Sequence, residues 1–296
     1  MPQLTLDQRR MVDRGVTEKA SAFHWAIPRF PNRINIVGEG DSWFAYPKKH
    51  LIWGKPSNIL GWVAKAVGGK DKANVLQMAG NGDEAVEMIA GKQKHELAEV
   101  LRKSGKHIHF ILFSGGGNDV VGKWDMERLL NQYEPGMSAR ACINEKRFKR
   151  KLLQIRMAYE ELLELRNEYA PNARVVTHTY DFVKPNKIPA KFLFGKIKTG
   201  PWIHPYLIDK GIPEDKHELV VKHLLKDMRA MQEDLASKPV SKGKLIVVNT
   251  QGELTPGSRT HWKDEMHPTA AGFKRITRKI YNEMRKLESK LPAFPS

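Results

Sequence analysis

The stretch INIVGEGDSWFAY, residues 34–46, reads as a buried strand that ends in a tight turn. Apolar β-branched residues fill its first half, and a glycine-rich segment follows them. Ser42 then stands where the strand releases the chain, at the carboxyl edge of the predicted sheet. Open α/β sheets bind their ligands at that edge. A serine there is a candidate nucleophile if a base and an anion-stabilising site lie beside it.

Short apolar strands alternate with helices along the rest of the chain, a pattern typical of a parallel sheet with helices on both faces. The predicted strands are residues 34–37, 73–79, 107–114, 173–179 and 244–249. Helices are expected over 5–26, from 57 or 58 to 67, from 83 or 84 to 102, and over 145–169, 213–237 and 268–287. We expect a single domain over residues 1–296, with an N-terminal helical extension at 1–32 and a cap inserted at 181–241.

The composition is that of an ordinary folded protein. Of 296 residues, 41% are apolar and 28% are charged, which excludes a disordered chain. The sequence contains no apolar run long enough to span a bilayer, and its first residues lack the apolar stretch of a secretory signal. Cys142 is the only cysteine, so no intrachain disulfide can form. The cytoplasm is the default expectation, although export without a signal peptide would leave the same sequence.

The formal net charge of +17 predicts attraction to an anionic partner, either nucleic acid, phospholipid head groups or an acidic polysaccharide. The alternative is a soluble surface rich in lysine. Residues 184–198 mix lysines with aromatic and aliphatic side chains and contain no acid. Such a stretch suits peripheral docking on an anionic membrane, or a cap whose aromatic side chains face inward. Nucleic-acid binding is the weaker option because no recognised module accompanies the charge.

Polar clusters lie in order along the chain, the first three where predicted strands end. They are residues 40–42 (GDS), 81–84 (NGDE), 116–119 (GGND) and 264–268 (DEMHP). A serine hydroxyl needs a base to remove its proton during attack, and we expect His267 to act on Ser42. Asp264 lies three residues before His267 and can hold the imidazole in the required tautomer. The expected oxyanion donors are the N–H groups of Ser42 and Gly82 and the side-chain amide of Asn118.

These blocks resemble those of the SGNH, or GDSL-type, hydrolase family. The family's serine block is present as GDSW around Ser42, and its Gly-x-Asn-Asp block as GGND with Asn118. Asp264 and His267 match the Asp-x-x-His block. The glycine block is the loosest match, since NGDE points to Gly82 with Gly80 as the rival.

The resemblance implies a flavodoxin-like three-layer α/β/α sandwich with a five-stranded parallel sheet. It also implies acyl-ester hydrolysis that needs no cofactor, and no metal cluster is visible in the sequence. The region 181–241 departs from the family's compact core. The expected substrate is therefore open among a lipid or phospholipid, a small ester and an acetylated sugar.

Other folds and functions fit the sequence less well. The glycines at 115–117 lack the following Lys-Ser/Thr of a phosphate-binding P-loop. An α/β-hydrolase elbow needs a glycine two residues after the serine, where this chain has Phe44. A catalytically silent binding module for anionic membrane or nucleic acid is one alternative to the predicted esterase. An acyltransferase that uses the same triad is the other.

Overall fold

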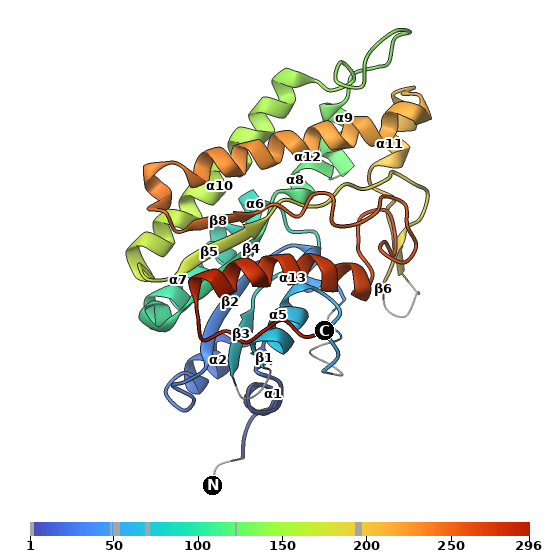
Figure 1. Ribbon diagram of the computed structural model, residues 1–296. Helices are drawn as coiled ribbons and strands as arrows, with labels where there is room; N and C mark the ends of the chain where they lie inside the picture. The colour runs from blue at the N-terminus through green and yellow to red at the C-terminus, as the bar shows by residue number, and fades with distance from the viewer. Residues whose placement is uncertain (1–2, 48, 50–53, 69–71, 122, 193–196) are drawn as a thin grey trace.

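A six-stranded parallel sheet forms the centre of the molecule, with the strand order β1-β3-β2-β4-β5-β8 (Figure 1). The computed structural model describes residues 3–47, 49, 54–68, 72–121, 123–192 and 197–296. The strands are β1 (Val16–Thr17), β2 (Ile34–Gly40), β3 (Ala73–Gln77), β4 (Phe110–Ser114), β5 (Arg174–His178) and β8 (Leu245–Val248). A separate antiparallel hairpin is formed by β6 (Ala190–Phe192) and β7 (Ile197–Thr199).

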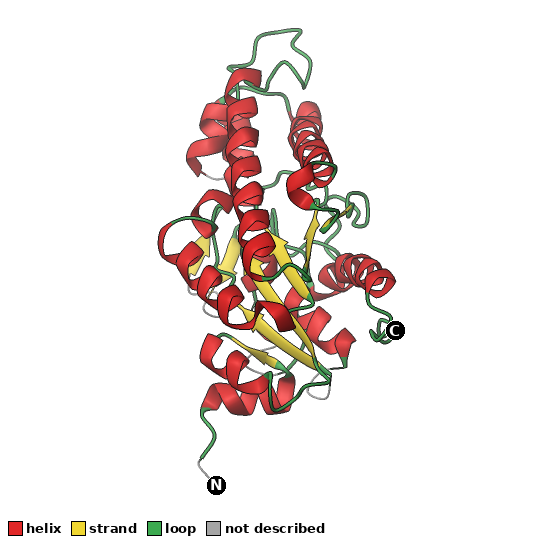
Figure 2. Cartoon of the chain, turned by 90° about the vertical axis from the view of Figure 1, so that its left-hand side faces the viewer, coloured by secondary structure: helices red, strands yellow, loops and turns green. Residues whose placement is uncertain are grey.

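Helices cover both faces of the sheet, as predicted (Figures 1 and 2). They are α1 (Leu6–Arg14), α2 (Ala20–Ala26), α3 (Ser42–Ala45), α5 (Ile59–Val67), α6 (Ala85–Met88), α7 (Gly91–Ser104), α8 (Gly117–Val121), α9 (Lys123–Leu129), α10 (Glu145–Tyr169), α11 (His204–Asp209), α12 (Glu214–Ala236) and α13 (Ala270–Leu287). On one side α5 packs against α13, and on the other α10 packs against α7 and α12. None of the helices in the described part of the chain is both long and apolar enough to cross a bilayer.

The sixth strand corrects the predicted five-stranded sheet. The single helix expected over residues 5–26 is wrong, because Gly15 ends α1 in a left-handed conformation with φ of 69°. Val16 and Thr17 then pair with β3 before α2 begins. Two β-branched residues directly after a helix-ending glycine are typical of a short strand, and the helical spacing on either side obscured them.

The helix expected from 83 or 84 to 102 is also two helices. The chain turns between α6 and α7, and Gly91 at the start of α7 adopts a positive φ of 50°. Positive φ is a backbone state that glycine adopts far more readily than other residues. The longer helices, α10, α12 and α13, are confirmed to within two residues of their predicted ends.

The segment expected to form a cap, residues 181–241, holds the β6–β7 hairpin, α11 and α12. Its last helix, α12, packs on α10 and β8 in the helix layer. The hairpin side of the segment lies against the loop that precedes α13, because the N–H of Glu265 donates to the carbonyl of Ile188 at 3.2 Å. The side chain of Tyr46 also donates to the carbonyl of Lys191 at 2.6 Å. The segment therefore contacts both parts of the chain that carry the predicted triad residues, one directly after Ser42 and the other between Asp264 and His267.

We expect Leu163→Ala to lower the free energy of unfolding by about 2–5 kcal/mol, because it leaves a cavity in the core. Leu163 lies on α10 and has no exposed surface. Leu153 on the same helix is 56% exposed and provides the matched control. Urea denaturation of Leu153→Ala should show a change within about 0.5 kcal/mol. Equal effects of the two substitutions would contradict the packing described here.

Candidate active site

The predicted site residues meet at the point where the strand order reverses. From β2 the chain passes to β3 on one side and then returns to β4 on the other, so β2 lies between them. Ser42 follows β2, and Asn118 lies in the helix that follows β4. The two strand ends are tied together by the N–H of Asp41, which donates to the carbonyl of Ser114 at 2.9 Å. Parallel α/β sheets bind ligands at such a reversal, beyond the carboxyl ends of the strands.

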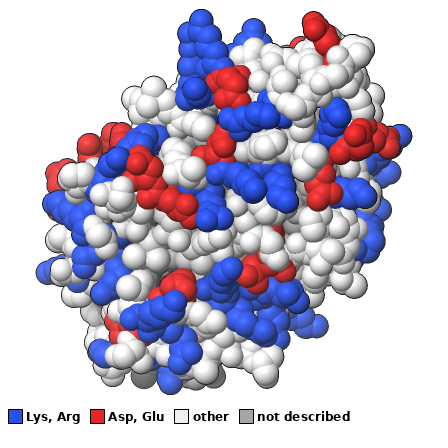
Figure 3. Space-filling view, turned by 45° about the horizontal axis from the view of Figure 1, so that its top comes forward, with Lys and Arg blue, Asp and Glu red and all other residues white. Residues whose placement is uncertain are grey.

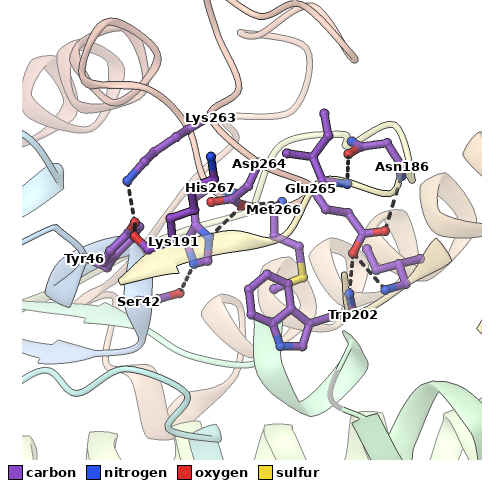
Figure 4. Close-up of polar contacts among 12 residues, drawn as sticks. Ser42, Tyr46, Asn186, Lys191, Trp202, Lys263, Asp264, Glu265, Met266 and His267 are labelled. Carbon is purple, nitrogen blue, oxygen red and sulfur yellow. Dashed lines mark hydrogen bonds and ion pairs between the residues drawn. The ribbon is translucent and has the colours of Figure 1, made fainter. Parts of the chain in front are cut away.

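Ser42, His267 and Asp264 form a continuous hydrogen-bonded chain (Figure 4). The Nε2 atom of His267 lies 2.9 Å from the Oγ of Ser42, although the two residues are 225 positions apart. The Nδ1 atom of His267 lies 2.8 Å from the Oδ1 of Asp264. All three are buried, and Ser42 is the most exposed at 6%. The arrangement can remove a proton from the serine and stabilise the imidazolium that results.

Asp264 is held as a carboxylate by three donors on one oxygen. Its Oδ1 accepts the backbone N–H groups of Met266 at 3.1 Å and His267 at 2.9 Å, besides the imidazole. Burial by itself raises the pKa of Asp264, but the hydrogen bonds and charge of His267 outweigh it and hold that pKa below its usual value. The Asp-x-x-His spacing thus places both residues in one tight turn before α13.

Solved structures share this architecture at low sequence identity. An extracellular lipase from Streptomyces rimosus is 16% identical and has a TM-score of 0.51 over 85% of this chain and 99% of the lipase. The lipase Lip_vut3 from goat rumen metagenome is 14% identical, with a TM-score of 0.51 over 84% of this chain and 96% of that one. The chain has the SGNH hydrolase fold.

Phospholipase A1 from Streptomyces albidoflavus is structurally similar to this chain to the same degree, with 15% identity and a TM-score of 0.50 over 85% of this chain and 99% of the phospholipase. No protein-family model and no curated protein matches the sequence itself. The likeness therefore concerns the SGNH fold. In this chain the fold carries one strand more than the five expected, since β1 extends the sheet beyond β3.

A buried network behind Ser42 holds the turn of this SGNH fold in place. Asp41 caps α3 by accepting the N–H of Trp43 at 3.0 Å, and it also accepts the hydroxyl of Ser114 at 2.9 Å. The hydroxyl of Tyr180 donates to its other oxygen. Burial raises the pKa of Asp41 to about 6, and these hydrogen bonds act against the rise. Asp41 therefore braces the turn that presents Ser42.

His178 completes the network and was not among the predicted site residues. Its Nε2 lies 2.9 Å from the hydroxyl of Ser114, and its ring stacks on Trp43 with centroids 5.2 Å apart. Burial lowers the pKa of His178 to about 3, so this histidine is neutral at ordinary pH. The sequence could have indicated His178 by its position, because it ends β5 as Ser114 ends β4, and Tyr180 follows two residues later.

The predicted oxyanion donors lie at the same edge of the sheet, with Ser42 at the start of α3, Gly82 in the loop after β3, and Asn118 in α8. The side-chain amide of Asn118 donates one hydrogen to the carbonyl of Asp83 at 2.9 Å, which leaves its second hydrogen for a ligand. The N–H of Gly80 is already bonded to the carbonyl of Gly40 at 2.9 Å. Within the described ranges, the N–H groups of Ser42 and Gly82 have no hydrogen-bond acceptor. Of the two rival glycines, Gly82 is thus the one whose donor is free.

Metal ligands do not gather here or elsewhere in the described residues, where no group of three or more His, Cys, Asp or Glu side chains could hold an ion. The groups available for chemistry at the carboxyl edge are a hydroxyl, an imidazole, a carboxylate and hydrogen-bond donors. This is the set that acyl transfer to and from a serine requires.

Proposed function

We propose that the protein is a serine hydrolase that cleaves acyl esters. The observation that carries the proposal is the ordered contact of Ser42 with His267 and of His267 with Asp264, at 2.9 and 2.8 Å. The fold neighbours named above, two lipases and a phospholipase A1, support the same class of reaction.

In the proposed reaction the Oγ of Ser42 attacks the ester carbonyl carbon while Nε2 of His267 accepts its proton. Asp264 holds the imidazole and stabilises its positive charge. The tetrahedral intermediate collapses, the C–O bond to the alcohol breaks, and His267 returns the proton to the leaving oxygen. Water then attacks the acyl-enzyme with His267 as base, which releases the carboxylic acid and restores Ser42.

The carbonyl oxygen carries negative charge in both tetrahedral intermediates. We assign its stabilisation to the N–H groups of Ser42 and Gly82 and to the side-chain amide of Asn118. The free donors of Ser42 and Gly82, and the second hydrogen on Asn118, support this assignment. Fixed donors of this kind need no reorganisation as the charge develops.

Asn118→Ala is expected to lower kcat by about 10²- to 10³-fold with little change in KM, because the lost donor acts mainly in the transition state. Steady-state kinetics on a short-chain p-nitrophenyl ester measures the effect. Asn172→Ala, an exposed substitution at the opposite edge of the sheet, should leave both constants unchanged. A rise in KM with an unchanged kcat would contradict the assignment of Asn118 to the oxyanion site.

A fluorophosphonate probe tests the proposal directly, because it reacts with an activated serine. We expect covalent labelling of the wild-type protein at Ser42, together with hydrolysis of at least one ester in a panel of acyl lengths. Folded wild-type protein that neither labels nor hydrolyses any ester would overturn the proposal. Salt-dependent binding of that inactive protein to anionic vesicles or nucleic acid would instead favour the silent binding module.

The surface charge does not gather in one patch on the face that Figure 3 shows, where Lys and Arg lie among Asp and Glu. Some cations of the molecule are paired with acids, as in Lys94 with Glu161 at 2.6 Å and Arg140 with Asp227 at 2.5 Å. Of the basic stretch 184–198, residues 193–196 lie outside the described residues. Contact with an anionic lipid or an acetylated polysaccharide therefore stays a prediction.

A further inference from the structure

We infer that this hydrolase is specific for short acyl groups, with acetyl preferred over any longer chain. The inference rests on the proposed function and names the substrate class of the same site. Three features carry it, namely the size of the cavity beside Ser42, the chemistry of its lining, and the hydrogen bonds that fix one of its walls.

The cavity beside Ser42 and Asn118 has a volume of about 30 Å³. A space of that size holds about two water-sized groups, which is enough for the methyl of an acetyl group. Sites that take drug-sized ligands are about ten times larger. The remaining wall is mainly apolar and consists of Val121, Val183, Ile203, Val221, Leu225 and Met266. An eight-carbon chain would have to displace several of these side chains.

Apart from Ser42 and Asn118, which face the ester group, the polar side chains in the lining already have hydrogen-bond partners, so the cavity suits a plain alkyl group. The carboxylate of Asp181 accepts the backbone N–H groups of Phe182 at 2.7 Å, Gly252 at 2.5 Å and Leu254 at 2.6 Å. The hydroxyl of Tyr180 donates to Asp41. An acyl group with its own hydroxyl or amine would lose hydrogen bonds to water there without regaining them from these two side chains.

Glu265 fixes the wall that contains Ile203 (Figure 4). This carboxylate is only 1% exposed. It accepts the N–H groups of Trp202, of Ile203 at 3.0 Å and of His204 at 2.8 Å, and also that of Asn186 at 3.3 Å. Moving the wall outward would leave a buried carboxylate without donors, which is unfavourable.

The hydrogen bonds of Glu265 also join this wall to the triad. Glu265 stands between Asp264 and His267 in sequence, and the ring of Trp202 lies edge-on to His267 at 5.6 Å. The turn that orients the base thus also sets the depth of the acyl pocket. Glu265 is a positioning residue, since it acts through Ile203 and Trp202.

The test compares kcat/KM for p-nitrophenyl acetate, butyrate and octanoate with the full chain. Wild type is expected to prefer acetate over octanoate by at least 100-fold. Leu225→Ala and Val221→Ala enlarge the cavity from α12 and should each raise the butyrate-to-acetate ratio by 10-fold or more. Leu219→Ala, on the same helix at a residue that is 48% exposed, is the matched control and should not change the ratio.

Glu265→Gln replaces one of the two acceptor oxygens with an NH2 group, which cannot accept the backbone N–H groups that bond to that oxygen. The octanoate-to-acetate ratio should rise at least 5-fold in this variant, and Glu265→Asp, which keeps the carboxylate, should restore part of the preference. Fluorophosphonate labelling of Ser42 should persist in both. A merely structural role would lower all three ester rates together and leave the ratio constant.

A wild-type protein that hydrolyses octanoate as well as acetate would overturn the inference and leave the hydrolase itself standing. Unchanged ratios in folded Leu225→Ala and Val221→Ala would overturn it as well. Absence of both labelling and hydrolysis of every ester would instead overturn the proposed function. Thermal unfolding of each variant shows which of these comparisons are made on folded protein.

Discussion

Ser42→Ala is expected to lower kcat for ester hydrolysis by about 10⁵- to 10⁶-fold, an effect that only a substitution of His267 should match. Without its hydroxyl no acyl-enzyme can form, and only the oxyanion donors and substrate binding remain. The melting temperature should change little, because the turn is held by Asp41 rather than by the Ser42 side chain. Steady-state kinetics and fluorophosphonate labelling measure the loss.

Ser237→Ala is the matched control, since this serine is exposed at the end of α12 and should show full activity. His267→Ala added to Ser42→Ala should cost little more than either change alone, because the two residues act as a unit. If Ser42→Ala kept most of its activity, Ser42 would not be the nucleophile, however close it lies to His267.

Asp264→Ala is expected to lower kcat by about 10⁴-fold. The imidazole of His267 then loses the acceptor that fixes its tautomer and the charge that stabilises its protonated form. Asp264→Asn should lose less activity, because an amide oxygen placed where Oδ1 lies still accepts the three donors that converge there. The kinetics of the two variants separates the effect of losing the acceptor that fixes the tautomer from the effect of losing the negative charge. Asp215→Asn, at an exposed aspartate, is the matched control.

The Asp264→Asn substitution should also change how the stability of the protein depends on pH. Because the pKa of Asp264 is lowered in the folded state, its carboxylate stabilises the fold above its unfolded pKa of about 4. That stabilisation is lost as the pH falls further, through the folded pKa. The free energy of unfolding of the wild-type protein should therefore fall more steeply with decreasing pH below about pH 4 than that of Asp264→Asn. Denaturation at a series of pH values measures both. Parallel curves would show that the triad carboxylate is not preferentially ionised in the native state.

The sequence predicted the site best where its residues directly follow the short strands that also define the fold. Strand-end clusters predicted that Ser42 and Asn118 would lie at one edge of a parallel sheet, because parallel strands all end there. Asp264 and His267 follow no predicted strand end, and they were expected to join Ser42 because its hydroxyl needs a base and that base needs an acceptor. The structure brings Ser42, Asp264 and His267 together. Periodicity predicted the long helices but missed β1, since two residues are too few for an alternation to appear.

The interactions that fix the site geometry were beyond prediction for a different reason. His178 and Tyr180 reach Asp41 and Ser114 through pairings between β2, β4 and β5, and no local pattern encodes those pairings. Glu265 likewise looks like an ordinary acidic residue in the sequence. Its four backbone donors come from residues 60 to 80 positions earlier, so only the fold reveals that it is buried and fully used.

The short strand β1 has a consequence for how the protein can be handled. Val16 and Thr17 occupy the hydrogen-bonding side of β3 that would otherwise form the outer edge of the sheet. Removal of the first 32 residues would leave a row of unpaired backbone groups on an apolar strand, which is a template for self-association. A shortened protein could therefore keep Ser42, His267 and Asp264 in place and still be lost to aggregation during purification.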